Sequence, residues 1–247
     1  MGTSQSSKGS KNKSPLVPSW ADATPIPPMS PQRFRGFRGA IGQYVKSGNL
    51  TDLNRALGHY SRSASGGSAV AAKRFNPHYQ VGGNLFNILQ NKSITVNDVV
   101  IYLQNWVGKS TDEVIDYLSN TLSKDSGGDS EKIRYALNEA LSQALDGITK
   151  FSFDSITDEV LINILINYLV ECVFIQVIHE AGDSWKKSTD AQTPVQAENA
   201  MHELIKVVVD QKICTKFAGG INSLSAADIL EIQQNTILDV WHEWEAF

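Results

Sequence analysis

The sequence has few of the residues from which cross-links are built. Its 247 residues include two cysteines, which cannot form a disulfide framework, so packing must supply the stability. Cys172 and Cys214 each lie in an apolar, helix-like run, and we interpret them as separate, buried, reduced thiols. Reduced cysteines are typical of an intracellular compartment.

Motifs of catalysis and cofactor binding are also missing. Neither glycine pair, at 66–67 and 82–83, has the spacing of a phosphate-binding loop, and no CxxC or HExxH pattern occurs. No serine stands in a G-x-S-x-G elbow. Glu198 and His202 share a helix face, but a metal site needs three or four converging ligands. We therefore expect no catalytic residue, no metal site and no intrinsically bound cofactor, and hence a protein that is not an enzyme.

Long apolar runs are scarce as well. No leader-like apolar stretch follows the first lysines, so nothing predicts secretion. Residues 156–178 are long enough to span a bilayer, but Glu159, Asn163, Asn167 and Glu171 form one polar stripe along a helix. Because a carboxylate in lipid is costly, we interpret this segment as the central helix of a soluble bundle. The expected location is cytoplasmic, with no transmembrane segment.

The sequence does have an uneven distribution of charge. Residues 1–80 hold eleven Lys and Arg against two Asp, which gives a net charge of +9. Residues 81–247 hold the other eleven against 24 Asp and Glu, which gives −13, so the total of −4 hides a strong asymmetry. This asymmetry predicts that the front third meets phosphate, an anionic membrane surface, an acidic protein or the chain's own acidic remainder.

Composition and periodicity divide the chain into three segments. Residues 1–30 are rich in Ser, Lys, Gly and Pro and predict a disordered, Pro-rich tail with a short apolar island that ends in Trp20. A Trp in such a tail is expected to dock, either on the chain's own body or on a partner. Residues 31–75 predict a basic helical neck, and residues 76–247 predict an acidic helical body that forms one globular unit with the neck.

Hydrophobic residues recur three or four positions apart through the neck and body, which favours helices. The longest expected helix covers about residues 155–181. The candidate N-caps are Asn49 or Thr51 for one helix, and Ser110 and Ser225 for two others. The run VVIYL after Asp98 fits a strand locally, but its flanks continue with helical period, so we expect a helix after Thr95. The predicted fold class is all-α, with a single bundle-like domain of about eight helices.

Basic side chains of the neck alternate with aromatic ones. Such interleaving occurs at nucleic-acid-binding surfaces, but no recognised nucleic-acid motif is present. We therefore favour a surface that docks protein and keep a nucleic-acid-binding module as the alternative. The candidate docking residues are Trp20, Arg33, Arg35, Arg38, Arg55, Arg62, Lys73 and Arg74.

The chain starts Met1-Gly2-Thr3-Ser4, which is its most specific short feature. A small residue at position 2 predicts removal of Met1, which leaves an α-amine with an ordinary pKa near 8. This amine is partly neutral at cellular pH and is suited to acylation by another enzyme. Gly2 with Ser6 also fits the N-myristoylation pattern, so a lipid-anchored adaptor is a further alternative.

Three stretches of the first 75 residues carry a family resemblance. The start MGTSQSSKG, the following LVPSWAD and the basic stretch from RFRGFRG to AVAAKRF resemble the QatB family of the bacterial Qat antiphage system. The resemblance implies a non-enzymatic component of a defence complex. Its implied partners are an ATPase, a TatD-like DNase and a QueC-like enzyme, with the helical body as their scaffold.

The resemblance to the QatB family also implies a reaction, because one of the implied partners is a QueC-like enzyme. Such an enzyme implies an ATP-dependent, amide-forming step on a 7-deazaguanine carboxylate. The implied acceptor is the α-amine of Gly2, which would carry a covalent 7-deazaguanine adduct. Thr3 and Ser4 would then be the residues that the partner enzyme recognises.

Overall fold

The computed structural model describes residues 30, 32–96, 99–124, 126–187, 192–217 and 219–247. The all-α prediction is confirmed, with nine α-helices in these residues where about eight were expected. The helices are α1 (Phe34–Ser47), α2 (Leu50–His59), α3 (Ser68–Arg74), α4 (Asn76–Asn91), α5 (Thr111–Ser123), α6 (Ser130–Ala144), α7 (Asp158–Ala181), α8 (Gln192–Ile213) and α9 (Ala226–Glu245).

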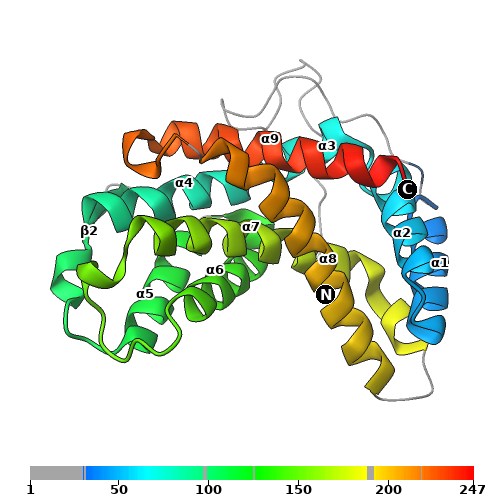
Figure 1. The fold of residues 1–247 in the computed structure, drawn as a ribbon, viewed down its shortest axis with the longest axis horizontal. Helices are drawn as coiled ribbons and strands as arrows, with labels where there is room; N and C mark the ends of the chain where they lie inside the picture. The colour runs from blue at the N-terminus through cyan, green and yellow to red at the C-terminus, as the bar shows by residue number, and fades with distance from the viewer. Residues whose placement is uncertain (1–29, 31, 97–98, 125, 188–191, 218) are drawn as a thin grey trace, which may run out of the picture.

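Helix α7 is the central element of the fold. It packs along α6 and also contacts α4 and α8 (Figure 1). Its interior positions Leu165, Leu169 and Val173 are fully buried. It is the one helix of the described residues long and apolar enough to cross a membrane, and 67% of its most apolar window is buried inside the protein. Such burial is typical of the core helix of a bundle.

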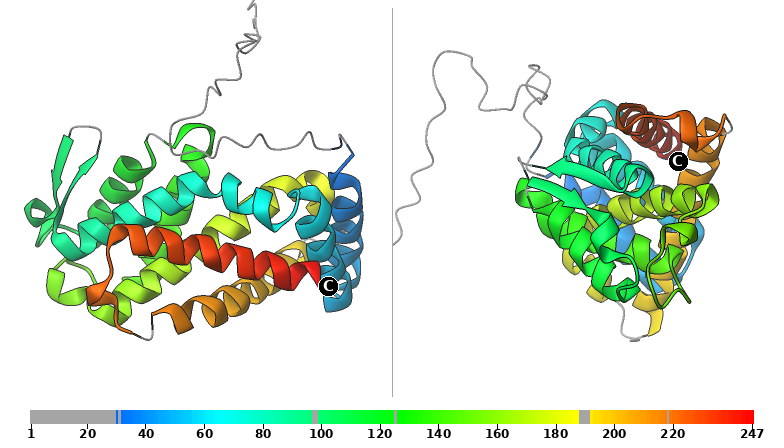
Figure 2. Two further views of the ribbon diagram at one scale, coloured as in Figure 1. Left: turned by 90° about the horizontal axis from the view of Figure 1, so that it is seen from above. Right: turned by 90° about the vertical axis from the view of Figure 1, so that its left-hand side faces the viewer.

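The molecule has two distinct ends, and α9 lies along one side of it. Helices α1 and α2 pack on each other at one end, and a β-hairpin lies at the other (Figure 2). Helix α9 lies along α4, α3 and α8, so the end of the chain returns to the neck. One continuous hydrophobic cluster runs from Phe37 in α1 to Trp244 in α9, and it joins the neck to the body.

The helix expected after Thr95 is wrong. The structure has an antiparallel hairpin of β1 (Ser93–Val96) and β2 (Val99–Tyr102), in which Ile94 pairs with Ile101. Ile101 is buried, whereas its neighbours Val100 and Tyr102 are 47% and 56% exposed. This alternation with a period of two, in a β-branched run, favours a strand over a helix.

The predicted caps at Ser110 and Ser225 are confirmed, and of the two candidates for α2 the structure has Asn49 as the cap instead of Thr51. The Asn49 side chain accepts a hydrogen bond from the backbone N–H of Thr51 at 2.9 Å. Glu113 accepts one from the backbone N–H of Ser110, and Ser225 and Asp228 form a reciprocal capping box at the start of α9. These side chains satisfy N–H groups that have no partner within the helix.

The backbones of α4 and α9 lie so close together at Gly83 that a substitution there tests how tightly the two helices pack. A Cβ at Gly83 would lie 2.9 Å from the backbone oxygen of Ala226, the first residue of α9. We expect Gly83→Ala to lower the free energy of unfolding by about 1–3 kcal/mol, because a backbone atom must move. Gly39→Ala at an exposed position of α1 is the matched control, since a Cβ there meets nothing within 4 Å, and it should raise the free energy of unfolding by up to about 1 kcal/mol. Urea unfolding measures both, and equal effects would contradict the packing.

Candidate docking surface of the basic neck

Two of the predicted docking arginines lie on either side of an aromatic ring in α1. The guanidinium carbons of Arg33 and Arg38 are 4.5 and 5.0 Å from the centroid of the Phe34 ring, within the range of cation–π attraction. Arg33 Nε donates to the backbone oxygen of Ala64 at 3.1 Å, and Arg38 Nε donates to that of Glu180 at 2.9 Å. Both arginines therefore tie α1 to other parts of the same chain.

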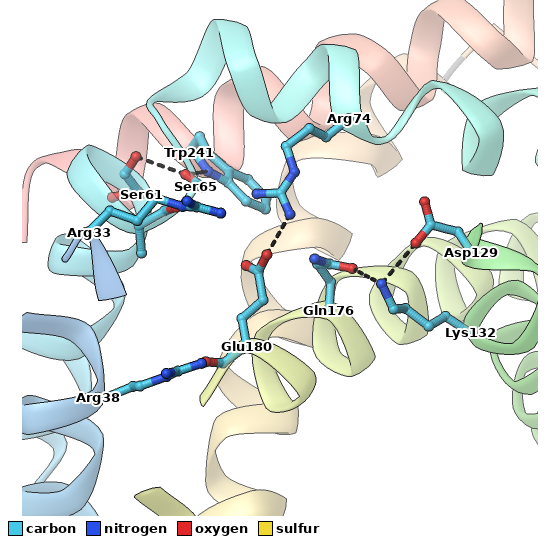
Figure 3. A network of polar contacts seen from close by, with 11 residues as sticks. Arg33, Arg38, Ser61, Ser65, Arg74, Asp129, Lys132, Gln176, Glu180 and Trp241 are labelled. Carbon is cyan, nitrogen blue, oxygen red and sulfur yellow. Dashed lines mark hydrogen bonds and ion pairs between the residues drawn. The ribbon is translucent and has the colours of Figure 1, made fainter. Parts of the chain in front are cut away.

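Glu180, near the end of α7, binds the neck a second time through its side chain. Its Oε1 forms an ion pair with Arg74, the last residue of α3, and the side chain is only 9% exposed (Figure 3). The Glu180 Oε2 atom is buried without a hydrogen-bond partner. Burial and the Glu180 carboxylate together raise the pKa of the Tyr60 hydroxyl well above its usual value. The Glu180 carboxylate thus places a buried negative charge next to Arg74 and Tyr60 of the neck.

The other docking candidates lie nearer to solvent. Arg62 donates to the backbone oxygen of Glu245 in α9 at 2.5 Å. Arg55 is 54% exposed and pairs with Asp52 at 2.7 Å on the surface of α2. Arg35 and Lys73 are exposed. Gly2, Thr3, Ser4 and Trp20 lie outside the described residues.

The arginines of the neck therefore bind the chain itself to a large extent. Arg33, Arg38, Arg62 and Arg74 all have partners within the protein, three of them outside the neck. The acidic body supplies one ion-pair partner, the Glu180 side chain for Arg74, whereas Arg38 and Arg62 donate to backbone oxygens of the body. Arg35, Arg38, Arg55, Arg62 and Lys73 are all exposed, so a partner within the chain does not remove these side chains from the surface.

A small polar cavity lies beside the Arg74–Glu180 pair. It has a volume of about 50 Å³ and is lined by Arg74, Phe75, His78, Asp129, Lys132 and Gln176. Lys132 Nζ donates to Asp129 at 2.8 Å and to Gln176 at 2.9 Å (Figure 3). Burial lowers the pKa of His78 to about 4, and both of its ring nitrogens lack a hydrogen-bond partner. The cavity is large enough for a few ordered water molecules that could serve those nitrogens.

A second buried polar pair lies on the polar stripe of α7. Glu159 and Asn163 are exposed, but Glu171 is buried, where it accepts hydrogen bonds from Gln143 at 3.1 Å and meets His202 Nε2 at 2.7 Å. The hydrogen bond to Glu171 raises the pKa of His202. The stripe thus enters the core of the bundle at the point where α6 and α8 supply partners.

The two cysteines differ in their surroundings. Cys172 is buried in α7, where burial raises the pKa of its thiol. The prediction that Cys214 is buried is wrong, because the chain leaves α8 there and enters a 3₁₀ turn at the surface. The described residues contain no group of three or more side chains that could hold a metal ion.

Sequence reasoning missed two polar contacts across the fold. The position of Glu180 near the end of an apolar helix gives no sign in the sequence of its partners Arg38 and Arg74. Ser68 at the start of α3 also binds the end of α9, since its Oγ lies 3.1 Å from His242 Nε2 and its N–H donates to Glu245 at 3.0 Å. Contacts at such sequence separations carry no local signal.

The Arg74–Glu180 pair should be more important for stability than an exposed pair. Arg74→Met leaves a buried carboxylate without its cation, and we expect it to lower the free energy of unfolding by on the order of 2–3 kcal/mol. Arg55→Met removes an exposed partner of Asp52 and should cost less than about 0.5 kcal/mol. Chemical denaturation of both variants makes the comparison. The account would be wrong if the two losses were equal, or if adding Glu180→Leu to Arg74→Met restored no stability.

Comparison with known proteins gives the chain a family. A model of the family described as "Qat anti-phage system associated protein QatB" matches residues 66–243, which is more than half of the chain. No curated protein and no solved structure matches. The stretches that first suggested this family lie in residues 1–75, so the helical body adds evidence that those stretches did not contain. The chain therefore belongs to the QatB family and is a component of an antiphage defence system.

Proposed function

We propose that the chain is a non-enzymatic, cytoplasmic substrate and scaffold of its defence system. In this proposal the α-amine of Gly2 is exposed by removal of Met1 and is joined to a 7-deazaguanine carboxylate by a QueC-like partner enzyme. The helical body holds the system's ATPase and TatD-like DNase. The observation that carries the proposal is the start Met1-Gly2-Thr3-Ser4 in a chain of the QatB family.

The bond that forms is an amide. The partner enzyme would first activate the carboxylate with ATP, and the neutral amine of Gly2 would then attack the activated carbonyl and release the activating group. The amine needs only its ordinary pKa near 8 for part of the population to be nucleophilic at cellular pH. Thr3 and Ser4 are small side chains that a narrow active site can accept, and we assign them to recognition.

The geometry of the described residues supports such a role. Ser30 and Gln32, where the described chain begins, are exposed at the end of the molecule formed by α1 and α2. The 29 residues before them can reach up to about 95 Å when extended. This reach allows a terminus to enter a partner's active site while the body is bound elsewhere.

The nucleic-acid alternative has less support in the geometry. A phosphate-binding surface needs basic side chains that are available to phosphate, whereas Arg33, Arg38, Arg62 and Arg74 are bound within the chain. The myristoylated adaptor uses the same Gly2 and differs from the leading proposal in the mass that is added.

Intact-mass analysis of the chain co-expressed with its QueC-like partner tests the proposal. We expect the mass to rise by one 7-deazaguanine acyl group, located by fragmentation on the peptide that begins with Gly2. Gly2→Glu should keep Met1 and lose the adduct, whereas Gly39→Ala, a change at an exposed position of α1, should keep it. A chain that loses only Met1 beside an active partner would contradict the proposal, and a myristoyl mass would favour the adaptor instead.

A further inference from the structure

A groove lies where the described part of the chain begins. It has a volume of about 470 Å³, which is within the range of pockets that bind small ligands. Ser30 is at its edge, and α1, α2 and the segment that follows α2 form its walls. The other lining residues are Gln32, Arg33, Gly36, His59, Ser63 and Gly66.

The walls of this groove suit a flat amphipathic ring. A Cβ at Gly36 would lie only 3.1 Å from His59 Nδ1, so the glycine lets the imidazole lie close against the backbone of α1. Arg33 is held by its hydrogen bond to Ala64, and its guanidinium is thereby fixed beside the groove. A fixed guanidinium and a flat imidazole can stack on an aromatic ring, and the Ser63 hydroxyl can accept a hydrogen bond from an indole N–H.

One wall of the groove has an unusual backbone. Residues Tyr60–Ala64 form a π-helix, in which the Ser65 N–H bonds to the Tyr60 carbonyl five residues earlier. Such turns are rare and often occur at functional sites. The buried Tyr60 ring packs against Phe37 and Trp241, so this wall is anchored in the core while Ser63 faces the groove. The groove is therefore a built feature of the neck.

We propose that residues 16–20 of the same chain occupy this groove, with the Trp20 indole between Arg33 and His59. The inference goes beyond the proposed role of Gly2 and does not depend on it. Trp20 precedes Ser30 at the edge of the groove by ten residues, and ten residues can span up to about 33 Å. A tethered segment reaches an effective concentration in the millimolar range, which favours it over a free peptide of another protein.

Docking at Trp20 has a consequence for the terminus. In this proposal 15 residues precede the docked segment, and the groove fixes the point from which they extend. The reach of the terminus from the groove then falls to about 50 Å. The groove would thus set the distance at which a partner can engage the N-terminus.

Fluorine NMR of the full chain labelled with 5-fluorotryptophan tests the docking. The chain has five Trp residues, and Trp20→Phe assigns the Trp20 signal. We expect the Trp20 fluorine to be protected from a soluble paramagnetic quencher. Ser63→Leu and Gly36→Leu, which fill the groove, should abolish that protection, and Gly39→Leu, one turn away on the same helix with open space around it, should retain it.

The fluorine signal of Trp20 also distinguishes this docking from two alternatives, in which a second copy of the chain or another partner fills the groove. Protection that disappears on dilution would mean that a second copy supplies the Trp, and a fully accessible Trp20 would mean that the groove awaits another partner. Either result overturns the proposal. A second readout is the His59 ring resonance, which Trp20→Ala should shift without any change in the groove itself. An unchanged His59 resonance would also contradict docking, even if the groove variants disturb the fold.

Discussion

The burial of α7 is the constraint on which the rest of the structure depends. This 24-residue helix is apolar on most of its surface, so neighbours must cover it from several sides. Helices α4, α6 and α8 do so along its length, and the turn after α7 packs against α1. Glu180 lies one residue before the end of α7, so the same burial leaves its carboxylate in need of a cation and its backbone oxygen in need of a hydrogen-bond donor.

The basic neck supplies those partners. Arg38 and Arg74 come from two different helices and both bind Glu180, one at its backbone oxygen and one at its side chain. Opposite charges of the neck and the body therefore meet in the Arg74–Glu180 pair. The two contacts of Glu180 join the neck to the end of α7, and Arg35 is exposed at the surface of α1.

The sequence predicted the features that arise from local periodicity. The all-α class, the position of α7 and the caps at Asn49, Ser110 and Ser225 follow from hydrophobic spacing and from side chains that satisfy nearby N–H groups. The hairpin at 93–102 was missed because a short β-branched run was judged by its flanks. The partners of Glu180 and the groove at Gly36 and His59 could not be predicted, because they join residues that only the folded chain brings together.

The central claim is that neck and body form one cooperative unit, with the terminus as the part that is offered to other proteins. Hydrogen–deuterium exchange of the full chain tests it most directly. The account predicts that amides of α1 and α2 exchange through the same global opening as those of α7 and α9, and that Arg74→Met accelerates both sets together. Fast exchange in α1 and α2 beside a protected α7 and α9 would contradict it, because the neck would then be a separate element that rests on the body.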